Sequence, residues 1–187
     1  ALSEARLHEL LGIVGVQAAD AGGWILDAAE SLGIDEGRLG SALRSSDGAV
    51  RRGALMGLTR VWVDSGDVVG TIAEMAQQQS EDSLRFDAID ALADLPVHSR
   101  ELESVVQTVL TRLGASTDGA IRVSALEALG RRGVATPEAI GELREALQDA
   151  DARVRISGIL GCTCLGPKGR PLSSVVLRLA SDADEPP

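Results

Sequence analysis

Aromatic side chains are nearly absent from this sequence. Trp24, Trp62 and Phe86 are its aromatic residues and there is no tyrosine, although 44% of the chain is hydrophobic. Leucine, valine, isoleucine and alanine must therefore fill the interior. This composition is typical of closely packed helices, in which small and branched side chains interdigitate at high density.

Cysteine and histidine are also scarce, which limits the chemistry available to the chain. Cys162 and Cys164 stand two apart, so on a helix their side chains point about 200° apart around the axis. They are poorly placed to bridge each other or to share a metal. His8 and His98 are far apart in the sequence. We therefore expect no disulfide framework, no metal and no other cofactor, and a reducing, cytoplasmic compartment.

The sequence has fewer basic than acidic residues, and it has no long apolar run. Eighteen basic residues stand against 28 acidic ones, which gives a net charge of −10. Nucleic acids and anionic membrane surfaces require a basic footprint. The best apolar run, LLGIVGV at 10–16, is much shorter than the ~20 residues of a spanning helix. We expect a protein partner, such as one with a basic or amphipathic segment, and neither nucleic acid nor a membrane.

Catalytic motifs are missing as well. The sequence contains no GxxxxGKS/T, no G-x-G-x-x-G and no H-E-x-x-H, and nothing in it marks a nucleophile elbow. We therefore expect the chain not to be an enzyme, and we assign it no catalytic residue.

What the sequence does contain is a repeat. The stretch DGAIRVSALEALG at 118–130 has near-copies at 47–58, 81–92 and 151–162. The copies align on Arg51, Arg85, Arg122 and Arg155. The successive intervals are 34, 37 and 33 residues. A repeat of this length, with small insertions between copies, predicts stacked helical hairpins.

Each copy has the spacing of a helix with a broad buried face. Counting the apolar residue before each arginine as position zero, apolar or small residues recur at zero, +4, +5, +7 and +8. In the third copy these are Ile121, Ala125, Leu126, Ala128 and Leu129. Alanine or glycine at +4 and +7 lets neighbouring helices approach closely, which compensates for the helix propensity that glycine lacks.

An acidic residue precedes each of these helices, and we expect it to cap the helix N-terminus. The arginine that follows can reach back to a carboxylate on the same or an adjacent turn. Repeated along the chain, these pairs would form a structural ladder that sets the register between repeats. Its predicted members are Asp47, Arg51, Asp82, Arg85, Asp118, Arg122, Asp151 and Arg155.

A second helix is expected after or before each copy. Amphipathic stretches predict helices at 35–45, 68–78, 101–114, 136–148 and 171–180. Thr136 is the expected cap of its helix, with Pro137 at the first helical position. A further hairpin at 3–19 and 22–33 has Trp24 at position zero and Ile25 in place of the arginine. We expect no β-sheet.

We expect residues 1–187 to form a single solenoid domain. Residues 1–33 would be a degenerate N-terminal cap, 34–165 the regular repeats, and 166–187 a terminal helix with an acidic tail. Two alternatives remain for the last hairpin. Either it is half-built and needs a partner surface, or the chain is part of a longer solenoid.

The repeat resembles a known family. A turn aspartate followed by V-R-x-x-A-h-x-x-L, after an amphipathic helix that ends in L-x-D, is similar to a HEAT repeat, and especially to the PBS-lyase HEAT-like repeats of bacteria and archaea. The resemblance is clear over residues 35–165. It implies an all-α, armadillo-like fold: a right-handed α-solenoid of about five HEAT-like helical hairpins plus a terminal helix, with the arginine-bearing helices lining the concave side. It does not imply one activity.

Positions +2 and +6 of the arginine-bearing helices lie opposite the core positions on a helical wheel. Position +2 reads Arg, Phe, Val, Ile along the four copies, which is unusual for a solvated face. Contiguous exposed apolar residues mark interaction surfaces, so these positions predict a concave ridge that binds a partner. The bland alternative is that the next repeat partly covers position +2. The predicted ridge consists of Arg52, Met56, Phe86, Asp90, Val123, Glu127, Ile156 and Leu160.

Together these features favour a non-catalytic protein–protein interaction scaffold that binds its partner on the concave face. The alternative is a bilin lyase-like or chaperone subunit that acts on an antenna or other client protein. Two further classes with this repeat fit less well. The HEAT-fold deoxyhypusine hydroxylases need several His-Glu pairs, and this chain has only His8-Glu9. The alkylpurine DNA glycosylases of related fold need a basic groove, whereas acidic residues occupy the predicted inner positions here.

Overall fold

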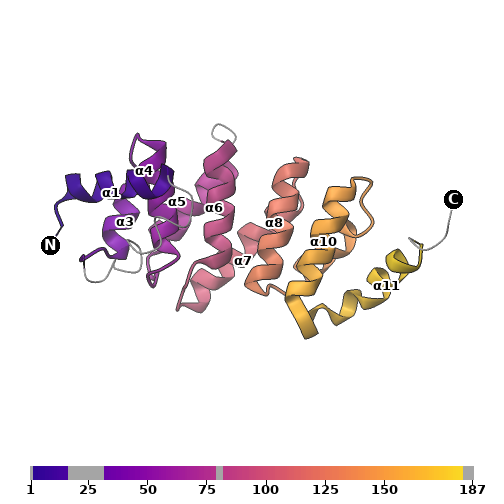
Figure 1. The fold of residues 1–187 in the computed structure, drawn as a ribbon. Helices are drawn as coiled ribbons and strands as arrows, with labels where there is room; N and C mark the ends of the chain where they lie inside the picture. The colour runs from indigo at the N-terminus through magenta and orange to yellow at the C-terminus, as the bar shows by residue number, and fades with distance from the viewer. Residues whose placement is uncertain (1, 17–31, 79–81, 183–187) are drawn as a thin grey trace. The chain divides into compact units, whose positions relative to one another are not determined.

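The computed structural model describes residues 2–16, 32–78 and 82–182, and it divides the chain into two compact units, Ala1–Val106 and Gln107–Pro187. The described residues of both units are helical and contain no strand (Figure 1). The all-α fold class is therefore confirmed. The predicted helix at 22–33, with Trp24 and Ile25, falls largely outside the described residues, and so does the end of the acidic tail. The single-domain organisation stays a prediction.

The first unit alternates the arginine-bearing helices with their hairpin partners. Helix α4 packs against α1, α3 and α6, and α5 packs against α6. The boundary between the two units falls inside α7. The helices are α1 (Glu4–Val16), α3 (Glu36–Ala42), α4 (Gly48–Leu58), α5 (Gly66–Gln77), α6 (Asp82–Asp94) and α7 (Arg100–Gly114).

The second unit continues the same alternation. Helices α8 and α10 lie side by side, and α9 contacts both (Figure 1). The elements are α8 (Gly119–Arg132), α9 (Pro137–Ala146), α10 (Ala152–Leu165), the 3-10 helix η1 (Gly166–Leu172) and α11 (Ser173–Asp182). The terminal helix begins later than the sequence predicts, because Pro167 and Pro171 fall within 166–172. Proline lacks the N–H that the α-helical ladder needs.

In the hairpins α4/α5 and α8/α9 the two helices begin with different caps. The arginine-bearing helices α4, α8 and α10 start after an aspartate, whereas α6 starts at Asp82 itself. Asp47 accepts the N–H of Ala49 at 2.8 Å, and Asp151 accepts that of Arg153 at 2.8 Å. The partner helices α5 and α9 start after a hydroxyl residue, and Thr136 accepts the N–H of Ala139 at 3.2 Å, whereas α3 starts after Asp35. Each cap satisfies a backbone donor that the first helical turn leaves without an intrahelical acceptor.

A short turn joins the two helices of a hairpin, and the sequence V-x-S/T recurs in it at 63–65, 97–99 and 134–136. The valine is buried at Val63 and Val134, and the hydroxyl residue caps the next helix. In the first unit two such turns lie side by side. Val63 donates its N–H to the carbonyl of Pro96 at 2.9 Å and forms an isolated parallel bridge with Val97.

Glycine permits very close helix contact in both units. A Cβ on Gly53 of α4 would lie 2.1 Å from the carbonyl oxygen of Leu11 in α1. In the second unit, a Cβ on Gly130 of α8 would lie 2.5 Å from the Cα of Gly161 in α10. Real Cβ atoms do not approach backbone atoms this closely, so these helices pack together only because the side chain is missing.

The described helices include none that is both long enough and apolar enough to span a bilayer.

Candidate partner-binding surface

The predicted ladder arginines close the turns that precede their own helices. Arg51 donates to the carbonyl oxygen of Ser45 at 2.6 Å, and Arg155 donates to that of Asp149 at 2.8 Å. The Nε of Arg85 donates to the carbonyl of Ala76, in the last turn of α5, at 3.2 Å. The sequence predicts carboxylates as the acceptors, but the structure also uses carbonyl oxygens here. A positive charge at these sites interacts favourably with the carbonyl groups at the C-terminal end of the preceding helix.

Arg122 makes the contact that connects two successive repeats. Its guanidinium pairs with Asp149 in the turn before α10, and both side chains are largely shielded from solvent. The Nε of Arg122 is buried and has no hydrogen-bond acceptor among the described residues. Burial, and next the neighbouring Glu145, raise the pKa of Glu142 above its ordinary value, and Arg122 opposes this rise.

The caps differ in what else they bind. Asp118 accepts the N–H groups of Ala120 and Ile121 at 3.0 and 3.3 Å. Asp151 also pairs with the side chain of Arg153 at 2.7 Å. Hydrogen bonds from Arg153 lower the pKa of Asp151 to about 2. The side chain of Asp82 lies outside the described residues, so the ladder as a continuous device stays a prediction.

In the first unit the predicted ridge is partly covered. Arg52 of α4 pairs through its Nε with Asp87 of α6 at 2.6 Å and donates to the carbonyl of Gly15 in α1 at 3.3 Å. Met56 and Phe86 are half-buried, whereas Asp90 is exposed. Here the alternative interpretation of position +2, partial cover by neighbouring elements, describes the arrangement better than a fully exposed ridge.

In the second unit the ridge positions are more open. Ile156 is 56% exposed and Leu160 is 48% exposed, one turn apart on α10. On the neighbouring helix α8, Val123 is half-buried. Glu127 accepts a hydrogen bond at 2.9 Å from the hydroxyl of the buried Ser157. The structure therefore brings together an exposed apolar pair on α10 with an acidic residue of α8 already engaged in packing.

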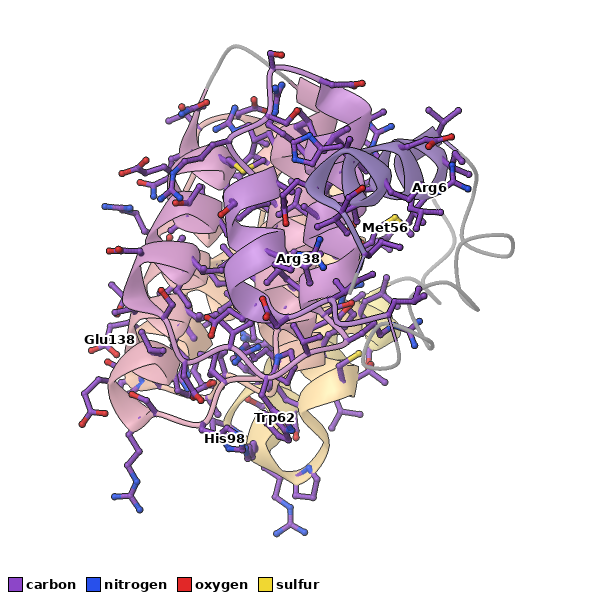
Figure 2. The ribbon with its side chains drawn as sticks, turned by 90° about the vertical axis from the view of Figure 1, so that its left-hand side faces the viewer. Arg6, Arg38, Met56, Trp62, His98 and Glu138 are labelled. Carbon is purple, nitrogen blue, oxygen red and sulfur yellow. The ribbon has the colours of Figure 1, made fainter. Side chains whose placement is uncertain are left out.

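One surface feature escaped the sequence-based reasoning. Trp62 and His98 stack with ring centroids 3.8 Å apart and planes 21° apart, and Figure 2 shows the two rings next to each other. Trp62 is 59% exposed. The two residues come from the adjacent turns after α4 and α6. The recurrence of V-x-S/T at 63–65 and 97–99 is the signal that would have aligned these turns.

Comparison with known proteins supports the fold. No protein-family model matches the chain, and no curated protein matches it in sequence. Among solved structures, a chain in the complex of CpcE and CpcF of phycocyanin lyase from Nostoc sp. PCC7120 is similar, with a TM-score of 0.62 and 18% identity. The match covers 85% of this chain and 99% of that one. An engineered protein is similar with a TM-score of 0.52 and 19% identity, over 87% of this chain and 72% of its own.

These likenesses establish a HEAT-like helical solenoid as the fold. They also correct one expectation, that the chain is not an enzyme. That prediction is wrong, because it treated the absence of catalytic motifs as an exclusion, and a chain of a lyase complex has this fold over nearly its whole length. The motifs that we searched for belong to other folds and carry no information about catalysis on a helical solenoid.

Proposed function

We propose that this chain is a lyase-type or chaperone subunit that acts on a client protein, in the manner of a bilin lyase acting on an antenna protein. The observation that carries the proposal is the structural likeness to a chain of the CpcE and CpcF complex of phycocyanin lyase, which extends over 99% of that chain. Within the proposal, the repeats belong to the PBS-lyase HEAT-like class and the protein works in the cytoplasm.

The exposed apolar pair on α10 supports a client-binding role. Ile156 and Leu160 occupy equivalent wheel positions one turn apart, and about half of each side chain is in contact with solvent. Covering a large aliphatic side chain completely contributes about 1.5–3 kcal/mol. Two adjacent half-exposed residues therefore offer a useful contribution to the free energy of binding. Other apolar residues of α10, such as Val154 and Leu165, are buried in the core.

The polar members of the ridge support a preformed surface. Arg52 is held by Asp87, and Glu127 is held by Ser157, in each case across two packed helices. Side chains fixed in this way lose little further conformational entropy when a client binds. We infer that, within each unit, the ridge residues form a rigid surface against which a client packs. The similar solved structure is a complex of two proteins, CpcE and CpcF. This supports a role for a second protein chain in the action on the client.

The proposal is tested by binding of the full chain to phycocyanin, with and without its chromophore, measured by biolayer interferometry. The test variant replaces both Ile156 and Leu160 by Asp. The matched control is Val105→Asp, because Val105 is 44% exposed on α7 and lies outside the ridge. We expect the wild type and the control to bind and the double variant to lose at least ~tenfold in affinity.

A second readout follows the visible absorbance of the phycocyanin chromophore during incubation. A spectral change that the double variant fails to produce would support lyase-type action. Absence of binding to both forms of phycocyanin would show that the proposal is wrong. If the control and the double variant lose the same affinity for phycocyanin, the ridge is not the surface that binds the client.

A further inference from the structure

Helices α10 and α11 diverge at one end of the second unit, as Figure 1 shows, with η1 between them. A groove of about 320 Å³ occupies the space between the three elements. Leu177 at its edge is 67% exposed. The side chains that line it are Ile159, Cys162, Thr163, Arg170, Val176 and Leu177. None of the described residues that line this groove is acidic.

The floor of the groove consists of repeat positions that are core residues elsewhere. Ile159 and Cys162 stand at +5 and +8 of the fourth copy. In the three earlier copies every residue at these positions is at most 1% exposed. These earlier residues are Leu55, Leu58, Ile89, Leu92, Leu126 and Leu129. In the fourth copy both are only half-buried, so an apolar stripe that the fold normally covers is left open.

The equivalent stripe of α8 indicates what kind of element would cover this one. The side chains of Leu126 and Leu129 lie close to Gly114 of α7, and the backbone of Leu126 is in contact with Gly161 of α10. Helices therefore close the stripe of the third copy. A helix with an apolar face is the occupant with the right shape for the open stripe of α10.

Among the described residues, the groove is lined by one basic residue, Arg170, and by no acidic residue. The chain has a net charge of −10, yet the three elements that form the groove, residues 152–182, contain five basic residues and one acidic residue, Asp182. Arg170 lines the groove, and neither its guanidinium nor that of Arg178 makes an ion pair with any described residue. Burial raises the pKa of Cys162 above its ordinary value, so the thiol adds no negative charge to the groove at neutral pH.

From this geometry and charge we infer that the groove between α10, η1 and α11 is a docking site for an acidic amphipathic helix of a partner protein. The apolar face of that helix covers Ile159, Cys162 and Leu177, and its carboxylates meet Arg170. This inference is independent of the proposed function, because it rests on the second unit alone and concerns a different face of α10 from Ile156 and Leu160.

The test uses the full chain and two designed helical peptides of roughly eighteen residues, which is about five turns. Both place Leu along one face; one carries Glu at the remaining polar positions and the other carries Lys. Fluorescence anisotropy is expected to show the Glu peptide binding about tenfold or more tightly than the Lys peptide, with affinity falling as salt is raised.

Leu177→Glu is expected to weaken binding of the Glu peptide about tenfold, and Arg170→Glu about fivefold. Val105→Glu is the matched control and is expected to bind like the wild type. Because Leu177 is largely exposed, its variant should keep an unchanged thermal melt by circular dichroism. The Ile156/Leu160 double variant is expected to lose the client and to keep the peptide, which separates this inference from the proposed function.

Four results would overturn the inference. The first is no binding of the Glu peptide, and the second is equal binding of the two peptides. The third is a dimer of the wild type in light scattering that Leu177→Glu makes monomeric, since the occupant is then a second copy of the chain. The fourth is sedimentation with phosphatidylserine vesicles that Leu177→Glu abolishes, since the occupant is then a membrane.

Discussion

The unit Ala1–Val106 holds eight basic and eighteen acidic residues, whereas the unit Gln107–Pro187 holds ten of each. The first unit thus carries the whole net charge of −10. Both units nevertheless build the same hairpins from the same apolar and small positions. The comparison teaches that the buried faces specify the repeat, while the charges are free to differ and to serve binding.

The two units also join their repeats in different ways. In the first, α1 and α4 meet through Gly15 and Gly53, where an added Cβ would lie 1.9 and 2.1 Å from a carbonyl oxygen. In the second, α8 and α10 meet glycine to glycine, and the distance for Gly130 is 2.5 Å. Arg122 reinforces this second contact by pairing across the repeats with Asp149. The first junction is tighter and therefore less tolerant of change.

The largest expected effect is that of Gly53→Ala. We expect a loss of about 3 kcal/mol in the free energy of unfolding, because the new methyl group must displace the backbone of α1. Gly130→Ala should lose less, since its nearest neighbours are atoms of another glycine. Urea denaturation measures both, and hydrogen exchange shows whether the damage stays within one unit.

The controls for this pair are Gly70→Ala and Gly141→Ala. Each glycine is helical, and nothing lies within 4 Å of its missing Cβ. These substitutions should stabilise the chain by about 0.5–1 kcal/mol through helix propensity. If Gly53→Ala and Gly130→Ala lower the free energy of unfolding equally, the first junction is not less tolerant of change than the second.

The second prediction compares the ridge residues of the two units. Phe86→Ala should destabilise by about 2 kcal/mol, because the ring is half-buried and its truncation leaves unfilled space. Ile156→Ala should change stability by only about 0.5 kcal/mol, because the side chain is 56% exposed. Thermal melts compare the two directly. A larger loss at Ile156 would mean that α10 is covered in solution.

The third prediction concerns the helix caps. Asp118→Ala should lose about 1 kcal/mol, and Asp47→Ala somewhat less, because Asp118 accepts two backbone N–H groups and Asp47 is seen to accept one. Asp118→Asn and Asp47→Asn are the controls, since asparagine caps a helix nearly as well. If the Asn and Ala variants are equally destabilised, the carboxylate acts through charge and not through the cap.

The smallest effect is a pH dependence confined to the second unit. Arg153 holds the pKa of Asp151 at about 2, below the ordinary value of 3.8. A lowered carboxyl pKa in the folded state favours folding above pH 3.8, and this contribution is lost as the pH falls through about 2. Arg153→Ala should raise the pKa of Asp151 toward 3.8 in a carbon-13 NMR titration.

Arg170→Ala is the control for this titration, because Arg170 is not among the residues that shift the pKa of Asp151. An unchanged titration of Asp151 in Arg153→Ala would contradict the assignment of the shift to this pair.

The sequence by itself determined the hairpins, because the 34-, 37- and 33-residue spacing and the +4, +5, +7 and +8 pattern fix which faces are buried. It also predicted caps such as Thr136, since capping depends on neighbours in the chain. Only the tertiary structure decided what each repeat meets. The partners of Arg51 and Arg122, the Trp62–His98 stack and the open stripe at Ile159 and Cys162 all depend on neighbouring elements, and a period within the chain does not encode those distances.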